Sequence, residues 1–260
     1  MAERKNILSD WLFPRDIKCI VCDDELRKDT RYGLCDACTL TPIADYCAAC
    51  GREVPPQNEL CDRCREERPL FTEARSCFTY EDAPASLVWR LKYRNARYLA
   101  PYMAEFMTDT FLQTDWKPDI LTFVPLHKSR RRERGYNQSQ LLAEALGERV
   151  HIPVREILVK TVKTKNLAKL SRTERKEAIA GSFALCDEAA VRGKSVLLID
   201  DVLTTGATSG ECAKVLRAGG ASEVYLLTFA SVPIKPVRIK EGGEKVRKHA
   251  EKKIKPPQKS

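Results

Sequence analysis

The residues best suited to metal chemistry lie near the N-terminus, where eight of the eleven cysteines form four Cys-x-x-Cys pairs. Twelve residues separate the first two pairs and ten separate the last two. A Cys-x-x-Cys hairpin places two thiolates on one side of a metal ion, and a second hairpin completes a tetrahedron. The spacing therefore predicts two successive zinc ribbons with two structural Zn²⁺ ions. The predicted ligands are Cys19, Cys22, Cys35, Cys38, Cys47, Cys50, Cys61 and Cys64.

Other interpretations of these cysteines are weaker. A disulfide framework suits secreted proteins, and residues 1–10 are charged and have no apolar signal core. A thioredoxin-like centre needs one Cys-x-x-Cys pair, not four in tandem. Ligation within each half is simplest, but interleaved ligation stays open. The ribbons are expected to hold residues 19–64 folded, with docking to nucleic acid or protein as a second role. Cys77, Cys186 and Cys212 stand alone and are expected to be small core residues.

A second candidate site follows a short apolar segment. Residues 196–199 are all apolar, and Asp200 and Asp201 come directly after them. A turn of small residues and then a helix follow, so backbone N–H groups can converge on a phosphate at the helix N-terminus. The two carboxylates are placed to accept hydrogen bonds from vicinal ribose hydroxyls, and they are the candidate catalytic residues. The candidate phosphate-binding residues are Thr204, Thr205, Gly206, Ala207 and Thr208.

Other nucleotide-binding motifs fit this segment poorly. A P-loop ATPase would also need GxxxxGK[ST], which the chain lacks, and the dinucleotide fingerprint GxGxxG is absent too. Residues 193–195 read Gly-Lys-Ser, but position 188 is Glu and the segment precedes a strand instead of a helix. A response-regulator acidic pair is not followed by this Thr/Gly loop. The combination of two acids with a phosphate nest favours a sugar phosphate.

The elements that must position these residues follow from hydrophobic periodicity. Strands are expected at residues 74–80, 120–125, 196–199 and 224–229. Helices are expected at residues 85–92, 98–111, 138–150 and 211–217, the last ending at Gly219 and Gly220. Alternating strands and helices predict an α/β domain with a mostly parallel sheet.

Length and charge divide the chain into four parts. We expect a lead-in at residues 1–18 containing Trp11 and Phe13, a double zinc ribbon at 19–66, a large domain at 71–232 and a basic tail at 233–260. The tail holds ten Lys or Arg and three Glu, so it carries +7 of the net +9 charge. We expect it to be solvated, with contact to nucleic acid or another polyanion as the alternative. No apolar run is long enough to cross a bilayer, so a cytoplasmic location is expected.

Residues 196–208 match, at every position, the ribose-phosphate signature of type I phosphoribosyltransferases. Together with the tandem Cys-x-x-Cys module and further motifs, the chain resembles the ComF family over about residues 15–232. The further motifs, in chain order, are Leu91-Lys92-Tyr93, Val124-Pro125-Leu126-His127, Arg134-Gly135-Tyr136-Asn137-Gln138, and Leu170-Ser171-Arg172 with Arg175, Gly181 and Phe183. The resemblance implies a double zinc ribbon followed by a type I phosphoribosyltransferase fold that binds 5-phosphoribosyl-1-pyrophosphate (PRPP). Competence members of the family are linked to uptake of single-stranded DNA.

The resemblance also implies the chemistry. A nucleophile displaces pyrophosphate at the anomeric carbon of ribose, with Mg²⁺ on the pyrophosphate. Basic residues expected at the pyrophosphate end are Lys92, Arg130, Arg131 and Arg134. His127 is a candidate to orient pyrophosphate or to act as a base, although a lone His after a strand more often has a structural role. A second basic stretch at residues 160–176 is a candidate lid. Leu167 and Ala178 replace the Gln and Asn usual in the family, within a stretch expected to form part of an active-site hood.

Three functions are compatible with these observations. The first is a phosphoribosyltransferase, the second is a nucleotide-sensing adaptor without turnover, and the third is a nucleic-acid-binding protein built from the ribbons and the tail. The intact loop favours PRPP or a nucleoside monophosphate as a ligand in the first two. The acceptor base and the oligomeric state have no readable code in the sequence.

Overall fold

The computed structural model describes residues 18–26, 31–162 and 172–234. Several expectations lie outside these ranges. They are the lead-in with Trp11 and Phe13, position 167, the Leu170-Ser171 part of the fourth motif, most of the predicted lid at 160–176, and the tail from residue 235 onward. Within the described ranges, no helix has the length and apolarity needed to span a membrane.

The larger domain is built on a four-stranded sheet in the order β1-β6-β5-β2. The strands are β1 (Glu73–Thr79), β2 (Ile120–Phe123), β5 (Ser195–Leu203) and β6 (Glu223–Ser231), and every neighbouring pair is parallel. β5 is an inner strand whose apolar residues 196–199 are all fully buried. Such continuous burial is expected of a strand covered on both faces. The predicted parallel α/β sheet is confirmed.

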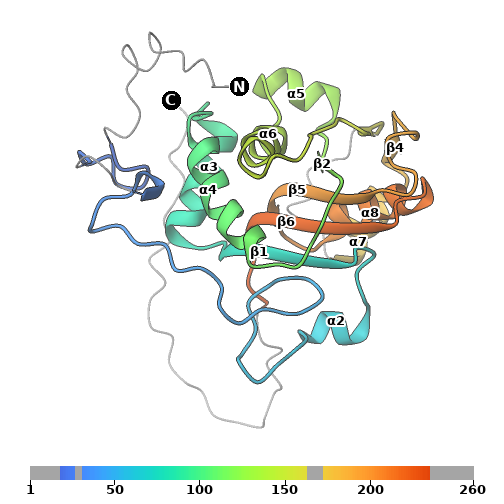
Figure 1. Ribbon diagram of the computed structural model, residues 1–260, viewed down its shortest axis with the longest axis horizontal. Coiled ribbons are helices and arrows are strands. Elements are labelled where there is room, and N and C mark those ends of the chain that lie inside the picture. Colours follow the sequence, from blue (N-terminus) through green and yellow to red (C-terminus); the bar gives the residue numbers. More distant parts are fainter. Residues whose placement is uncertain (1–17, 27–30, 163–171, 235–260) are drawn as a thin grey trace.

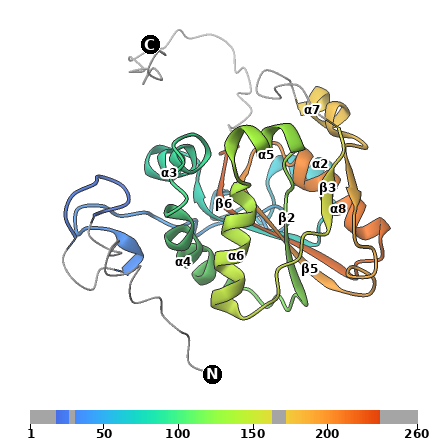
Figure 2. The same ribbon diagram turned by 90° about the horizontal axis from the view of Figure 1, so that it is seen from above.

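Helices cover both faces of this sheet (Figures 1 and 2). The face that carries Leu197 and Ile199 packs against α3 (Asp82–Tyr93), α4 (Leu99–Leu112) and α6 (Gln138–Val150). The opposite face, which carries Val196 and Leu198, packs against α8 (Ala207–Ala218). α5 (Lys128–Arg134) lies between β2 and α6 in the chain and buries no residue. The carboxyl ends of the parallel strands therefore meet at one edge, where sheets of this class bind ligands.

A small second sheet stands beside the main one. β3 (Leu158–Lys160) pairs antiparallel with β4 (Phe183–Leu185), and α7 (Arg172–Ile179) lies between them in the chain and packs on α8. Periodicity did not predict these elements, because strands of three residues show too little alternation to be detected.

The cysteine module attaches at two separate places. The first ribbon carries η1 (Arg31–Gly33), and its Ile20 is buried in the same core as α3 and α4. The second ribbon carries α2 (Asp62–Glu66), and its four cysteines are buried with residues of α8 and β5. Figure 1 shows the first ribbon in dark blue beside α3 and α4, and α2 in cyan beyond β1.

The lone cysteines differ from one another. Cys77 and Cys212 are fully buried, as expected for small core residues. The expectation for Cys186 is wrong, because this residue follows β4 at the surface and its thiol donates to the backbone oxygen of Glu156.

Candidate functional site

The eight paired cysteines form two clusters of four. Cys19, Cys22, Cys35 and Cys38 make one and Cys47, Cys50, Cys61 and Cys64 the other, and within each the sulfur atoms lie within 4.8 Å of one another. Ligation within each half is therefore the arrangement that this fold brings together. The Cys22–Cys35 and Cys50–Cys61 sulfur separations are 3.6 and 3.7 Å. A tetrahedral zinc site with Zn–S bonds of about 2.3 Å has edges of about 3.8 Å, so both clusters fit structural Zn²⁺.

The phosphate loop, defined as residues 200–208, joins the end of β5 to the start of α8. Gly206 is the N-cap of α8 and has φ 85°, a left-handed conformation that suits glycine. Gly206 itself has no side chain with which to cap the helix. The first turn of any α-helix leaves N–H groups without intrahelical acceptors. Of these, the N–H of Ala207 donates to Oγ1 of Thr205 at 3.3 Å. The loop therefore presents backbone donors at a helix N-terminus, the usual setting for a bound phosphate.

Asp201 is enclosed and already paired. Its side chain is 4% exposed, and Oδ1 lies 2.7 Å from Nζ of Lys92. Burial lowers the pKa of Lys92, but the negative charge of Asp201 outweighs this effect and the net pKa lies above its usual value. Lys92, expected at the pyrophosphate end, thus sits beside the acidic pair as the counterion of Asp201.

Asp200 is the more accessible of the two acids. Its Oδ1 accepts hydrogen bonds from the hydroxyl of Ser139 at 2.8 Å and from the N–H of Asp201 at 2.9 Å. Burial and the adjacent charge of Asp201 raise the pKa of Asp200 to about 7. Asp200 therefore changes charge in the physiological range, whereas Asp201 is held by a fixed cation.

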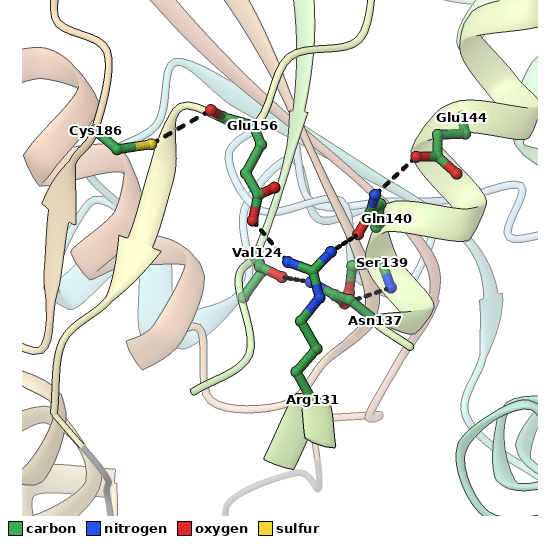
Figure 3. Close-up of polar contacts among 8 residues, drawn as sticks. All are labelled: Val124, Arg131, Asn137, Ser139, Gln140, Glu144, Glu156 and Cys186. Atoms are coloured by element: carbon green, nitrogen blue, oxygen red, sulfur yellow. Dashed lines mark hydrogen bonds and ion pairs between the residues drawn. The ribbon is translucent and has the colours of Figure 1, made fainter. Parts of the chain in front are cut away.

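The segment 134–139 connects three elements around this acidic pair. The hydroxyl of Tyr136 donates to the backbone oxygen of Leu91 in α3, and Nδ2 of Asn137 donates to the backbone oxygen of Val124 after β2 at 3.0 Å. Asn137 also caps α6 by accepting from the N–H of Ser139 at 3.0 Å. Figure 3 shows Asn137 between Val124 and Ser139. These bonds place the Ser139 hydroxyl against Asp200, so the segment positions one carboxylate of the site.

The three predicted arginines of α5 have different surroundings. Arg131 bridges Glu156 at 3.0 Å and Gln140 at 3.2 Å, as Figure 3 shows. Arg134 donates to Gln138 and lies 5.3 Å from the ring centre of Tyr93. Arg130 is exposed, and its charge lowers the pKa of Lys160 in β3. His127 is the N-cap of α5, and its Nδ1 accepts from the N–H of Ser129 at 3.2 Å. The geometry thus gives His127 a capping role.

The small β3–β4 sheet carries Lys160, which is near enough to Asp200 for the two charges to affect each other. Burial lowers the pKa of Lys160 in β3, and the positive charge of Arg130 adds to this effect while the negative charge of Asp200 opposes it. Nζ of Lys160 lies 5.1 Å from the ring centre of Phe183 in β4. The N–H of Gly181 donates to Oε1 of Glu211 in α8 at 2.8 Å. Ala178, where the family usually has Asn, is exposed on α7.

Sequence reasoning missed two residues that touch this site. Ser139 directly follows the predicted motif, so its position one residue after Gln138 was the available signal. Arg52 lies in the second ribbon, yet its guanidinium donates to the backbone oxygen of Thr204 in the phosphate loop. No local pattern signals a contact between residues 152 positions apart.

Comparison with known proteins agrees with this arrangement. Residues 8–65 match the family described as Double zinc ribbon domain, and residues 137–257 match the Phosphoribosyl transferase domain. The Haemophilus influenzae protein named Competence protein F is 30% identical over 223 residues, covering 83% of this chain and 97% of that protein. The Escherichia coli K12 DNA utilization protein YhgH is 29% identical and covers 75% of this chain and 88% of its own. The Bacillus subtilis protein Competence protein ComFC is 29% identical, with 81% and 93% covered.

Solved structures also match about half of this chain. The glutamine PRPP amidotransferase of B. subtilis, complexed with ADP and GMP, is 21% identical with a TM-score of 0.36, covering 50% of this chain and 26% of that one. The adenine phosphoribosyltransferase of Leishmania tarentolae is 15% identical with a TM-score of 0.34, covering 53% and 73%.

Proposed function

This chain belongs to the ComF family of competence-associated proteins, with a double zinc ribbon and a phosphoribosyltransferase domain, and from that premise we propose that its phosphate loop binds PRPP or a nucleoside monophosphate. The observation that carries the proposal is the meeting of two unlike groups at the end of β5. A helix N-terminus with a left-handed Gly206 stands directly after a pair of carboxylates, one of them enclosed and one accessible.

The two parts of the loop suit the two parts of a ribose 5-phosphate. The phosphate is assigned to the N–H groups at the start of α8, together with the hydroxyls of Thr204, Thr205 and Thr208. Both hydrogen bonds to Asp200 end on Oδ1, so Oδ2 is the oxygen assigned to a ribose hydroxyl. Asp201, held by Lys92, contributes a fixed charge beneath the sugar instead of a direct contact.

The pyrophosphate of PRPP needs positive charge on the other side of the ribose. Lys160 and the exposed Arg130 are assigned to it, because the charges of Arg130 and Asp200 both affect the pKa of Lys160. Arg131 and Arg134 hold other partners and are assigned a supporting role. Mg²⁺, when bound, neutralises charge on the pyrophosphate. In transfer, an acceptor nitrogen would form a bond to the anomeric carbon as the bond to pyrophosphate breaks.

Calorimetry with a nucleoside monophosphate and with PRPP plus Mg²⁺ tests this proposal. Asp200→Asn removes the charged acceptor for the ribose, so affinity should fall by about 1.5–3 kcal/mol. Gly206→Ala forces a left-handed alanine at the phosphate, which should reduce affinity at least as much. Gly193→Ala is the matched control, because Gly193 has φ 70° with no atom within 4 Å of an added Cβ and lies before the opposite end of β5. Equal affinity in all four proteins contradicts the site.

Turnover is tested separately from binding. Incubation with PRPP, Mg²⁺ and each standard nucleobase should release pyrophosphate with one acceptor if the protein is a phosphoribosyltransferase. Tight binding without pyrophosphate release would leave the loop as a sensor of nucleotides, as expected of an adaptor.

A second function, binding of single-stranded nucleic acid, is favoured by an exposed aromatic pair on α3. Trp89 is 37% and Tyr93 62% exposed, and their ring centres lie 6.2 Å apart. Arg94 lies 4.9 Å from the ring centre of Trp89, and Arg134 lies over Tyr93. Exposed aromatic rings with interleaved cations are the usual stacking platforms for unpaired bases.

Titration with single-stranded DNA at several salt concentrations separates this platform from the basic tail. Trp89→Ala should weaken binding by about 1–3 kcal/mol and leave the salt dependence unchanged, because stacking releases no counterions. Deletion of residues 233–260 should instead reduce the slope of log affinity against log salt by about 0.7 for each phosphate that the tail neutralises. An unchanged affinity in Trp89→Ala would exclude the platform.

A further inference from the structure

Arg52 is a fully enclosed cation between the second zinc site and the phosphate loop. Its residue is only 3% exposed. One guanidinium nitrogen, Nη1, donates to Sγ of Cys50 at 3.5 Å, and the other, Nη2, donates to the backbone oxygen of Thr204. Arg52 is one residue beyond the hairpin turn at Gly51, and its own backbone oxygen accepts from the N–H of Cys47 at 2.7 Å. The ribbon therefore holds Arg52 at two points, its backbone oxygen and Nη1, and Nη2 extends from there to the loop.

The charge of Arg52 has a clear counterpart in the ribbon. A Zn²⁺ ion held by four thiolates carries a net charge of about −2, and such sites are usually surrounded by donors to the sulfur atoms. A buried guanidinium without a counter-charge would be strongly unfavourable. Nη1 of Arg52 donates to the Cys50 sulfur, so the position of Arg52 depends on the second ribbon.

The bond to Thr204 has a direct consequence for the phosphate site. The backbone oxygen of Thr204 and the N–H of Thr205 belong to the same planar peptide, and in a trans peptide they point in opposite directions. All peptides of this structure that are described are trans. Because Arg52 holds the oxygen toward the ribbon, the N–H of Thr205 is turned away from the ribbon.

The interface between the second ribbon and the phosphate loop contains a cavity. The cavity is about 160 Å³ and is bounded by Cys50 and Cys64 on the ribbon side and by Thr205, Gly206 and Ala207 on the loop side. Arg52 lines this cavity and joins its two walls. The side chain of Arg52 therefore connects the ribbon to the loop across this cavity.

We infer that Arg52 is a positioning residue of the phosphate loop, which fixes the Thr204–Thr205 peptide for phosphate binding and takes its own place from Cys50 of the second zinc site. The inference rests on the proposed function only for the identity of the ligand. The contact between ribbon and loop stands whatever the ligand is. It links the metal content of the second ribbon to the affinity of the loop.

The test compares Arg52→Met with Arg90→Met, Arg90 being an arginine that joins the first ribbon to α3 through the backbone oxygen of Ile20. Arg52→Met should keep two zinc ions, speed amide hydrogen exchange in residues 204–208, and raise the Kd for a nucleoside monophosphate at least about tenfold. Arg90→Met should leave both the exchange of the loop and the Kd unchanged. Unchanged exchange and Kd in Arg52→Met would overturn the inference.

Two further variants separate bridging from charge and from metal loss. Arg52→Lys keeps the charge but not the planar fork that reaches Cys50 and Thr204 together, so it should behave like Arg52→Met. A wild-type Kd in Arg52→Lys would overturn the bridging role. Cys64→Ser, which removes a ligand of the second zinc without touching Arg52, should also speed exchange in the loop. If wild-type protein bound no sugar phosphate, the proposed function would fail, and the exchange data would still decide the role of Arg52.

Discussion

The two zinc ribbons share one pattern of cysteines, but they differ in how deeply these cysteines are buried and in which part of the larger domain they contact. In the first ribbon, Cys22 is exposed and Cys35 and Cys38 are half-buried. In the second ribbon all four cysteines are buried and belong to the core between the sheet and α8. The first therefore resembles an attachment at the surface of the α4 side, and the second is part of the hydrophobic core that carries the phosphate loop. Two sites with the same four ligands can thus lie at the surface or within the hydrophobic core, depending on which residues pack over the cysteines.

The two ribbons also differ at the residue that directly follows their first Cys-x-x-Cys pair. Asp23 and Gly51 occupy this position and have nearly the same left-handed φ, 62° and 67°. A Cβ at Gly51 would lie 2.4 Å from the backbone oxygen of Ala74 and 2.5 Å from Cα of Arg75. Asp23 is exposed and its carboxylate lies 3.3 Å from Arg90. Only glycine allows the second hairpin to touch β1, whereas the first hairpin tolerates a side chain.

The largest expected difference between the ribbons is in stability after loss of a metal ligand. Cys35→Ser and Cys61→Ser remove the third cysteine of each site, so each should lower the zinc content from two ions to one. Cys61→Ser also opens the core beneath α8, so it should lower the free energy of unfolding of the larger domain by about 3 kcal/mol or more. Cys35→Ser should lower it by less than about 1 kcal/mol. Metal analysis with denaturant unfolding measures both, and equal destabilisation would remove the distinction between the ribbons.

A smaller difference is expected at the hairpin turns. Gly51→Ala introduces both backbone strain and a clash with β1, and should destabilise the protein by about 2–4 kcal/mol. Asp23→Ala changes only an exposed ion pair and the preference of Asp for the left-handed region, so about 1 kcal/mol or less is expected. Both variants should retain two zinc ions. If Gly51→Ala unfolded no more easily than Asp23→Ala, the close contact between the second hairpin and β1 would be contradicted.

Local patterns in the sequence predicted the features that depend on local chemistry. The cysteine spacing identified both cysteine clusters, and the apolar run at residues 196–199 predicted the strand that leads through a turn into α8. Phosphate binding by this turn stays a prediction. The parallel sheet followed from alternation of strands and helices. The extent of β5, which runs on to Leu203 through the acidic pair, did not follow, because carboxylates are unusual inside a buried strand.

Contacts between distant segments were not predictable in this way. Lys92 was placed at the pyrophosphate because it is cationic, but its partner is Asp201, which only the packing of α3 against the end of β5 determines. Arg52 and Ser139 reach the loop from other elements for the same reason. The physical cause is that hydrogen bonds across the fold depend on where elements pack, and no periodicity records that.

The smallest expected effect is the dependence of ligand affinity on pH. Because the pKa of Asp200 is raised to about 7, the folded protein holds a proton there that an exposed aspartate would release near pH 4. Raising the pH through 7 therefore ionises Asp200 at a cost in stability, and a ribose hydroxyl that donates to the carboxylate offsets this cost. Affinity for a nucleoside should rise about tenfold between pH 6 and 8. A nucleoside avoids the separate ionisation of phosphate near pH 6.

Variants of Asp200 and of each ribbon show which residues control the dependence of affinity on pH. Asp200→Asn should make the affinity independent of pH in this range, which assigns the effect to that carboxyl group. Cys35→Ser should reproduce the wild-type affinity and its midpoint, because the first ribbon packs on the opposite face of the sheet from α8. Arg52→Met should leave both the affinity for a nucleoside and its midpoint unchanged, since Arg52 contacts Thr204 in the phosphate-binding part of the loop and not Asp200. A shifted midpoint in Arg52→Met would show that the second ribbon also controls the charge of the acidic pair, and a flat wild-type profile would exclude Asp200 as the acceptor of the ribose hydroxyl.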